Sequence, residues 1–135
     1  TKPDKYNYQQ FISSSLDSKD FPFKECLNND IIIYAAAAGV HAGSYVDEEI
    51  LFYVNTHFPI TLIERLKTSF FKGAIITFGS YFEIGNNVEE KSFTEEELIY
   101  SKLPVPNNYC LAKRVLTRYI SSLVGASKNF HFILH

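Results

Sequence analysis

The sequence contains no methionine and no tryptophan in 135 residues, and it contains only two cysteines. A complete natural chain starts with methionine and usually holds several, so we expect a piece of a longer protein. Cys26 and Cys110 lack Cys-x-x-Cys spacing, and the four histidines lack the spacing of metal ligands. We therefore expect reduced thiols and no metal site.

The chain also lacks a long apolar run and a basic patch. No apolar stretch approaches the length of about 18 residues that spans a bilayer, and no signal peptide opens the sequence. We expect no membrane partner and a cytoplasmic location. The formal net charge is −2, with no dense lysine and arginine cluster, which argues against nucleic acid as a partner. The hydrophobic fraction of 46% is typical of a globular protein of one domain.

Apolar strands alternate with amphipathic helices along the sequence. Residues 30–39 form a continuous apolar run, which predicts a strand buried on both faces. A helix over 47–70, a strand over 73–80, a helix from 107 to about 124 and a strand over 129–135 follow. This order predicts a parallel sheet with right-handed crossovers and helices on both faces. The long connection at 81–108 is typical of a lid or a binding loop.

The last predicted helix carries a lysine on its apolar side. Asn107 provides an N-cap, and at about 100° per residue Lys113 lies on the same side as Tyr109. Cys110 and Arg114 take the opposite side. An ammonium group beside Tyr109 would lower the pKa of a phenol that ordinarily titrates near about 10. The alternative is that Lys113 extends along the helix to solvent.

The helix predicted at 47–70 also carries a polar residue on its apolar side, Asn55. Pro59, four residues later, has no N–H to donate to the Asn55 carbonyl. We expect a kink that leaves this carbonyl free to accept from water; a plain bend with a satisfied core asparagine is the alternative. Ser80 ends the next strand, and ligands bind at the carboxyl ends of strands in parallel sheets. Asn55, Ser80, Tyr109 and Lys113 should therefore converge on one rim of the sheet.

Four short motifs, in order between residues 30 and 135, together resemble one enzyme family. Tyr109 and Lys113 form a Tyr-x-x-x-Lys motif, and Ser80 stands five residues before Gly85. Residues 30–37 resemble an Asp-x-x-x-His-x-Ala-Ala strand, and residues 54–55 a Val-Asn pair. The sequence thus resembles the extended short-chain dehydrogenases/reductases, the NAD-dependent epimerase/dehydratase family, whose members modify nucleotide sugars.

The resemblance implies an α/β fold, a partial Rossmann-like doubly wound parallel sheet that lacks the first strand and the Gly-rich loop. Residues 1–135 would form an incomplete NAD(P)-binding Rossmann domain, with the substrate-binding C-terminal region absent. None of the six glycines has the Gly-x-x-Gly-x-x-Gly spacing that holds a pyrophosphate. We therefore expect the fragment itself to be inactive and to bind NAD or NADP poorly.

The family also implies catalytic roles. Tyr109 would be the acid/base that exchanges a proton with a sugar hydroxyl or keto oxygen. Lys113 would lower the pKa of Tyr109 and hold the nicotinamide ribose, and Ser80 would hydrogen-bond the substrate oxygen. Asn55 would join a proton relay to Lys113 through its carbonyl and a water.

Further positions would contact the cofactor, which in the family is NAD or NADP. The backbone of Ala35, Ala36 and Ala37 would line it, and Asp17 would meet the adenine.

The function implied is an NAD(P)-dependent nucleotide-sugar epimerase or ketoreductase, an oxidoreductase or isomerase of carbohydrate biosynthesis. Tyr81 and Phe82 stand where 4,6-dehydratases of the family carry Asp-Glu, which points away from dehydration. A non-catalytic dinucleotide-sensing or scaffold member of the same fold is the alternative. An unrelated flavodoxin-like domain would instead leave Lys113 exposed and Ser80 far from Tyr109. By family analogy, we also expect a homodimer through the two long helices.

Overall fold

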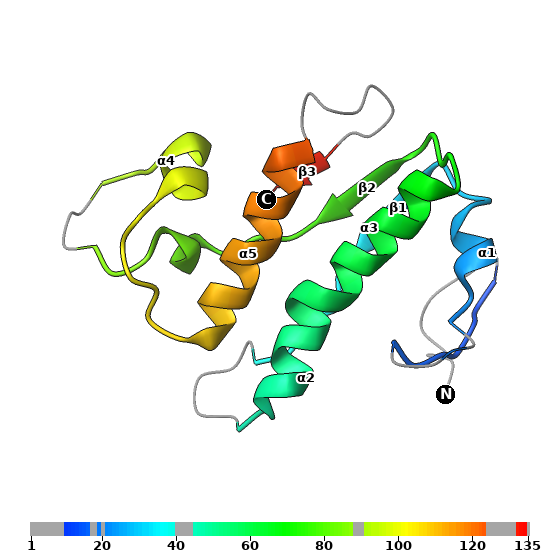
Figure 1. The fold of residues 1–135 in the computed structure, drawn as a ribbon, viewed down its shortest axis with the longest axis horizontal. Coiled ribbons are helices and arrows are strands. Elements are labelled where there is room, and N and C mark those ends of the chain that lie inside the picture. Colours follow the sequence, from blue (N-terminus) through cyan, green and yellow to red (C-terminus); the bar gives the residue numbers. More distant parts are fainter. Residues whose placement is uncertain are drawn as a thin grey trace.

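A computed structural model describes residues 10–16, 19, 21–39, 45–87 and 91–123, together with the backbone of 132–134. Strands and helices alternate along the chain (Figure 1). In chain order, the elements are α1 (Phe23–Cys26), β1 (Ile31–Tyr34), α2 (Glu48–Phe52), a π-helical turn (Tyr53–His57), α3 (Phe58–Thr68), β2 (Ala74–Thr77), a 3₁₀ helix (Tyr81–Ile84), α4 (Glu95–Tyr100), α5 (Asn108–Leu123) and β3 (Phe132–Leu134). Within these ranges, no helix is both long enough and apolar enough to cross a bilayer.

The three strands form one parallel sheet in the order β1-β2-β3. Ile31 pairs with Ala74 between β1 and β2, and Ile75 pairs with Phe132 between β2 and β3. Each strand is added beside the preceding one, so the predicted strand-helix-strand order and the parallel sheet are confirmed.

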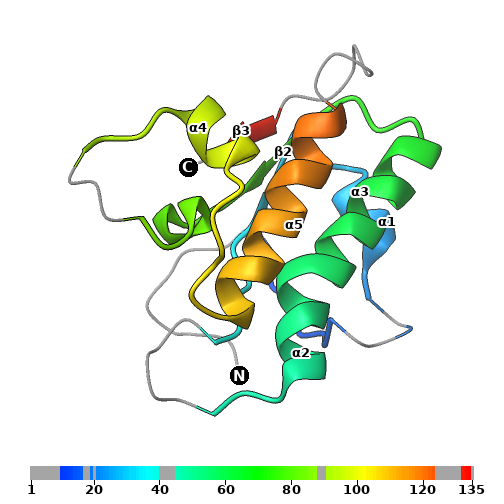
Figure 2. The ribbon, with the colours of Figure 1, turned by 60° about the vertical axis from the view of Figure 1, so that its left-hand side comes forward.

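The two long helices, α3 and α5, lie side by side on one face of this sheet (Figures 1 and 2). Right-handed crossovers that advance in a single direction place their helices on the same face. On the other face, the side chains of Ile31 and Ile33 are 57% and 61% exposed. The prediction that the first strand is buried on both faces is therefore wrong for the described residues, whose long helices cover only the face of Tyr34.

The hydrophobic core lies between the sheet and the helices. Phe58 is central to it, because its ring stacks on Tyr34 at 5.9 Å between centroids and meets the edge of Phe21 at 5.0 Å. The buried side chains of this core are Phe23, Tyr34, Phe58, Leu62, Ile63, Leu66, Phe71, Ile75, Leu116 and Ile120.

The predicted helix at 47–70 begins as expected and is interrupted by a π-helical turn. The Asp47 carboxylate caps the start of α2 by accepting from the N–H of Glu49 at 2.8 Å. In the π-helical register, Pro59 would face the Val54 carbonyl and cannot donate to it. The Tyr34 hydroxyl donates to that carbonyl instead, at 2.6 Å. The expected bend therefore takes the form of a π-helical turn. The carbonyl that Pro59 leaves without a backbone donor is that of Val54 and not, as predicted, that of Asn55.

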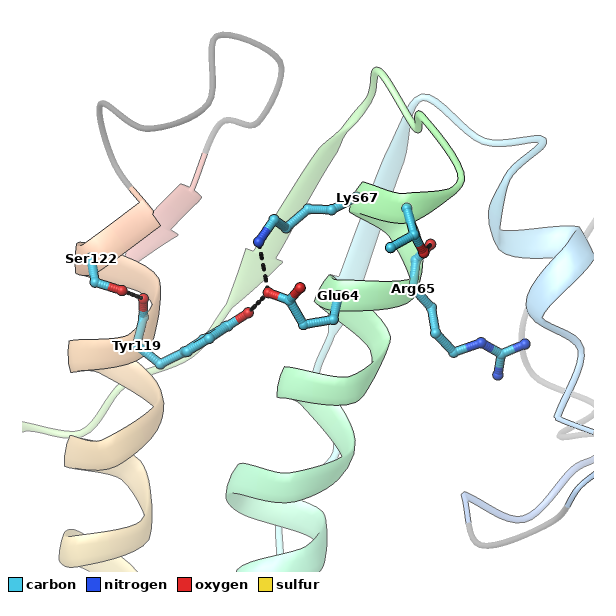
Figure 3. Close-up of polar contacts among 6 residues, drawn as sticks. Glu64, Arg65, Lys67, Tyr119 and Ser122 are labelled. Atoms are coloured by element: carbon cyan, nitrogen blue, oxygen red, sulfur yellow. Dashed lines mark hydrogen bonds and ion pairs between the residues drawn. The ribbon is translucent and has the colours of Figure 1, made fainter.

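A polar contact joins α3 to α5 on the side away from the sheet (Figure 3). One carboxylate oxygen of Glu64 accepts from the Lys67 ammonium at 2.7 Å and from the Tyr119 hydroxyl. Both donors lower the pKa of the Glu64 carboxyl, the lysine most. This contact fixes the two long helices relative to each other.

Two arginines of α5 hold the connection between β2 and α5. Arg114 donates to the carbonyls of Glu83 at 2.6 Å and Leu103 at 2.7 Å, and Arg118 donates to the carbonyls of Ile99, at 3.1 Å, and Ser101. The connection therefore packs on α5. Cys110 and Arg114, predicted on the side opposite the apolar one, are both buried.

Gly85 is the point where this connection turns back on itself. Its φ angle is +94°, a conformation that residues with a Cβ rarely adopt. A Cβ at this position would lie 2.7 Å from the carbonyl oxygens of both Leu103 and Pro104. Glycine thus allows residues 103–104 to pack directly against the backbone that follows the 3₁₀ helix.

Candidate functional site

The predicted site residues gather where β1 and β2 end and α5 begins. Ser80 lies three residues after β2, and Tyr109 and Lys113 lie one turn apart at the start of α5. Asn107 caps this helix as predicted: its side-chain oxygen accepts from the N–H of Cys110 at 3.0 Å, and its carbonyl accepts from the N–H of Leu111 at 3.1 Å. The cap determines where the helix begins and hence where the Tyr109 and Lys113 side chains lie.

Lys113 points into the protein, and its side chain is only 5% exposed. Its ammonium nitrogen donates to the Phe78 carbonyl at 2.9 Å and lies 5.9 Å from the centroid of the Tyr109 ring. Burial lowers the pKa of Lys113, and the carboxylate of Glu83 counteracts this by raising it. The inward orientation is confirmed, and the alternative that Lys113 extends to solvent is wrong.

Tyr109 and Ser80 face each other across the site. Ser80 and Tyr109 line the same cavity, and the Ser80 side chain acts to lower the pKa of Tyr109, which favours the phenolate. Burial, together with the nearby Cys110 and Glu83, nevertheless raises the pKa of Tyr109 above its ordinary value. The expectation that Lys113 lowers this pKa is therefore wrong for this structure, where the ammonium bonds the Phe78 carbonyl. The contact between Tyr109 and Ser80 also rules out the geometry expected of the flavodoxin-like alternative.

Asn55 is fully buried and holds the segment that follows β1. Its side-chain amide nitrogen donates to the carbonyls of Ala38 at 2.8 Å and Leu51 at 2.9 Å, and its side-chain oxygen accepts from the N–H of Ala38 at 3.3 Å. The amide therefore pairs with both backbone groups of Ala38. The relay role of the Asn55 backbone carbonyl stays a prediction.

The small residues after β1 leave its backbone accessible. Ala35 and Ala37 are exposed, and Ala36 is half-buried between them. Side chains that stop at Cβ allow a flat ligand to approach the strand end closely. Asp17, the predicted adenine contact, lies outside the described residues.

A cavity of about 660 Å³ opens beside Ser80 and Tyr109. The described residues that line it carry aromatic, amide, hydroxyl and thiol groups, and none of them is charged. Its side-chain lining comprises Ser80, Tyr81, Phe82, Asn86, Asn87, Pro106, Asn107, Tyr109 and Cys110. Asn86, Asn87 and Asn107 were not predicted to line the site, although the Gly85-Asn86-Asn87 run indicates a turn beside Ser80.

Two buried charged residues beneath the site were also not predicted from the sequence. Glu83 is 0% exposed and Arg114 is 8% exposed. The Ser80-x-x-Glu83 spacing is the signature of a helix capping box and could have indicated that Glu83 folds back onto Ser80. Nothing in the helical periodicity could have shown that Arg114 is covered. Among the described residues, no three histidine, cysteine, aspartate or glutamate side chains cluster as metal ligands.

No protein-family model matches the sequence, and no curated protein matches it. Solved structures that resemble the fold include two sugar-modifying or NADPH-bound proteins, as their names state. One is the ADP-L-glycero-D-manno-heptose-6-epimerase of Helicobacter pylori, with a TM-score of 0.61 and 15% sequence identity, covering 91% of this chain and 36% of the epimerase. The other is RMD from Pseudomonas aeruginosa complexed with NADPH, with a TM-score of 0.59 and 17% identity, covering 78% of this chain and 34% of RMD.

At these identities the likeness establishes the fold, and the chain spans about a third of the length of each structure. The described residues form a partial Rossmann-like α/β fold with a parallel sheet.

Proposed function

We propose that this chain carries the proton-transfer site of an NAD(P)-dependent nucleotide-sugar epimerase or ketoreductase. The observation that carries the proposal is the convergence of Ser80, Tyr109 and Lys113. Ser80 and Tyr109 line the same cavity, and a buried ammonium lies 5.9 Å from the centroid of the tyrosine ring. Burying an ammonium raises the free energy of the folded chain. A helix without a function at this position would gain nothing from an inward-pointing lysine.

Tyr109 is suited to act as an acid. A phenol ordinarily titrates at about 10, so Tyr109 is protonated at neutral pH and can donate a proton. A substrate carbonyl oxygen placed in the cavity would accept that proton from Tyr109, with Ser80 as the neighbouring hydroxyl. This direction of transfer suits reduction of a sugar ketone.

The residues present fit one end of a nicotinamide dinucleotide. Lys113 would hold the nicotinamide ribose, and the backbone of Ala35 to Ala37 would lie along the cofactor, because their side chains leave the strand end open. When bound, the cofactor supplies and removes hydride. The sequence offers no glycine loop for the pyrophosphate, so that contact would come from residues outside this chain. RMD, a neighbour in fold, is complexed with NADPH.

The cavity supports a sugar as the substrate. Amide side chains can hydrogen-bond hydroxyl groups, and exposed aromatic rings such as Tyr81 and Phe82 can pack against a sugar ring. The lining that the described residues provide is uncharged, which favours an uncharged ring in this part of the site. The H. pylori epimerase, by its name, acts on a sugar linked to a nucleotide.

Replacing Tyr109 by phenylalanine tests the proposal in the protein that contains this chain. Turnover would be followed through NAD(P)H absorbance with nucleotide-linked sugars and their keto forms. We expect kcat to fall about 100- to 10,000-fold, the usual contribution of a general acid, with unchanged thermal unfolding. Tyr100→Phe, which removes the hydroxyl of a 69% exposed tyrosine on α4, is the matched control.

Near-normal turnover in Tyr109→Phe would refute the catalytic role and favour the alternative of a dinucleotide sensor or scaffold. The retained Ser80, Tyr109 and Lys113 favour catalysis, because a sensor needs no proton donor. The homodimer and the cytoplasmic location stay predictions.

A further inference from the structure

The structure contains a buried carboxylate directly beneath the candidate site. Glu83 is 0% exposed and follows Ser80 by one turn of the 3₁₀ helix. One of its carboxylate oxygens accepts from the N–H of Ser80 at 2.6 Å, and its own N–H donates to the Ser80 carbonyl at 2.9 Å. Its other oxygen makes no hydrogen bond within the described residues. Ionisable side chains are rarely buried so completely unless they are paired.

A capping box does not require this burial, as a second one in the same chain shows. At the start of α4, the Glu97 carboxylate accepts from the N–H of Thr94 at 2.9 Å, and the Glu97 side chain is exposed. The two glutamates thus make the same local contact in opposite environments. The local contact alone therefore does not explain why Glu83 lies beneath the site.

The cationic groups near Glu83 come from α5. Arg114 donates to the backbone carbonyl of Glu83, and its terminal nitrogen Nη2 has no hydrogen-bond partner in the described part of the chain. Within the described residues, the Lys113 ammonium donates to one hydrogen-bond acceptor, the Phe78 carbonyl. Burial raises the pKa of Glu83, and both cations lower it through their charge. In return, the Glu83 charge raises the pKa of Lys113, which burial lowers.

Other titratable or polar groups also face this carboxylate. Thr117 of α5 lowers the pKa of Glu83, and the Glu83 charge raises the pKa values of Tyr109 and Cys110. From α4, Glu95 lines a small cavity together with Ser80 and Thr117. Among these groups, Lys113 and Tyr109 are the two that belong to the proposed proton-transfer pair.

We propose that Glu83 is a positioning residue of the site, which anchors the Ser80 backbone and provides the internal counter-charge of the Lys113 ammonium. The role assigned to Lys113 rests on the proposed function. A charge in a low-dielectric interior acts over a longer distance than at the surface. Glu83 can therefore support a protonated Lys113 without a direct ion pair, leaving the ammonium donors available for the Phe78 carbonyl and for a ligand.

Glu83→Gln separates the charge from the capping contact. A glutamine can still accept from the Ser80 N–H, but it carries no charge. Glu97→Gln, the same change in the exposed capping box, is the matched control. The measurement is the pH titration of the Lys113 side chain by NMR in the 135-residue chain labelled with ¹³C-lysine, with the signal assigned through its loss in Lys113→Arg.

We expect Lys113 to lose its proton at lower pH in Glu83→Gln than in the parent, and at the parent pH in Glu97→Gln. A Lys113 titration that is identical in Glu83→Gln and the parent would overturn the proposal. Tyr109 should shift in the same direction, because the Glu83 charge raises its pKa as well.

The reciprocal variant tests the proposal if Glu83→Gln does not fold. Because coupling between two sites is mutual, Lys113→Met should move the Glu83 titration to higher pH, and an unmoved Glu83 titration would likewise overturn it. Neither titration uses substrate or cofactor. Their failure would therefore leave the proposed function standing, whereas failure of the Tyr109→Phe experiment would not.

Discussion

Replacing Asn55 by alanine tests whether one buried amide holds the segment after β1 against the helix layer. The parent side chain makes three hydrogen bonds, of 2.8 Å and 3.3 Å to Ala38 and of 2.9 Å to the Leu51 carbonyl. Each such bond contributes about 0.5–1.5 kcal/mol net. The longest of the three bonds should contribute at the low end of this range. The loss is also limited because Ala38 is partly accessible to water, which can replace the amide. We therefore expect Asn55→Ala to reduce the free energy of unfolding by about 2–3 kcal/mol.

Urea unfolding of the 135-residue chain, followed by circular dichroism, measures this loss. Asn108→Ala is the control, because the exposed amide of Asn108 donates to Glu48 at 2.7 Å and should contribute less than about 0.5 kcal/mol. Amide exchange at Ala38 gives a local measurement, since its N–H loses its acceptor. A loss below about 1 kcal/mol, with unchanged exchange at Ala38, would refute the idea that Asn55 fixes the segment after β1.

Two further predictions concern Tyr34 and Glu83. Tyr34→Phe should reduce the free energy of unfolding by about 1 kcal/mol, because the Val54 carbonyl loses its donor. The cost should shrink in a Pro59→Ala background, which restores an N–H; a double-mutant cycle with equal costs would contradict this. The folded pKa of Glu83 is raised, so its contribution to stability is complete below its ordinary value of 4.5 and is lost as pH rises through the folded pKa. Glu83→Gln should therefore gain in melting temperature relative to the parent as pH rises; a constant difference across pH would show that the carboxyl titrates normally.

Local patterns in the sequence were sufficient for the order of elements and for most of the site. Capping residues and apolar periodicity depend on neighbours within a few positions, so the helix starts at Asp47 and Asn107 could be predicted directly. The inward positions of Asn55 and Lys113 followed from the same periodicity, and both are buried. The position of Ser80 followed from the end of its strand.

The electrostatics of the site could not be predicted in this way. The sequence suggested a lowered pKa for Tyr109, because it placed a lysine one turn away. The structure places the Lys113 ammonium on the Phe78 carbonyl and adds a carboxylate beneath the tyrosine, and the pKa is raised. Such balances depend on the distances and burial of groups from several elements.

The sequence by itself determined the order of the three strands and the long helices and the side chains that these helices present to the sheet, because those follow from contacts between near neighbours. Only the tertiary structure decided which other surfaces are covered. The 81–107 connection folds onto α5 and buries Cys110, Glu83 and Arg114, while Ile31 and Ile33 remain exposed on the open face of the sheet. The physical reason is that burial of a helix side or a sheet face depends on a segment distant in sequence, and the periodicity of one element carries no information about that segment.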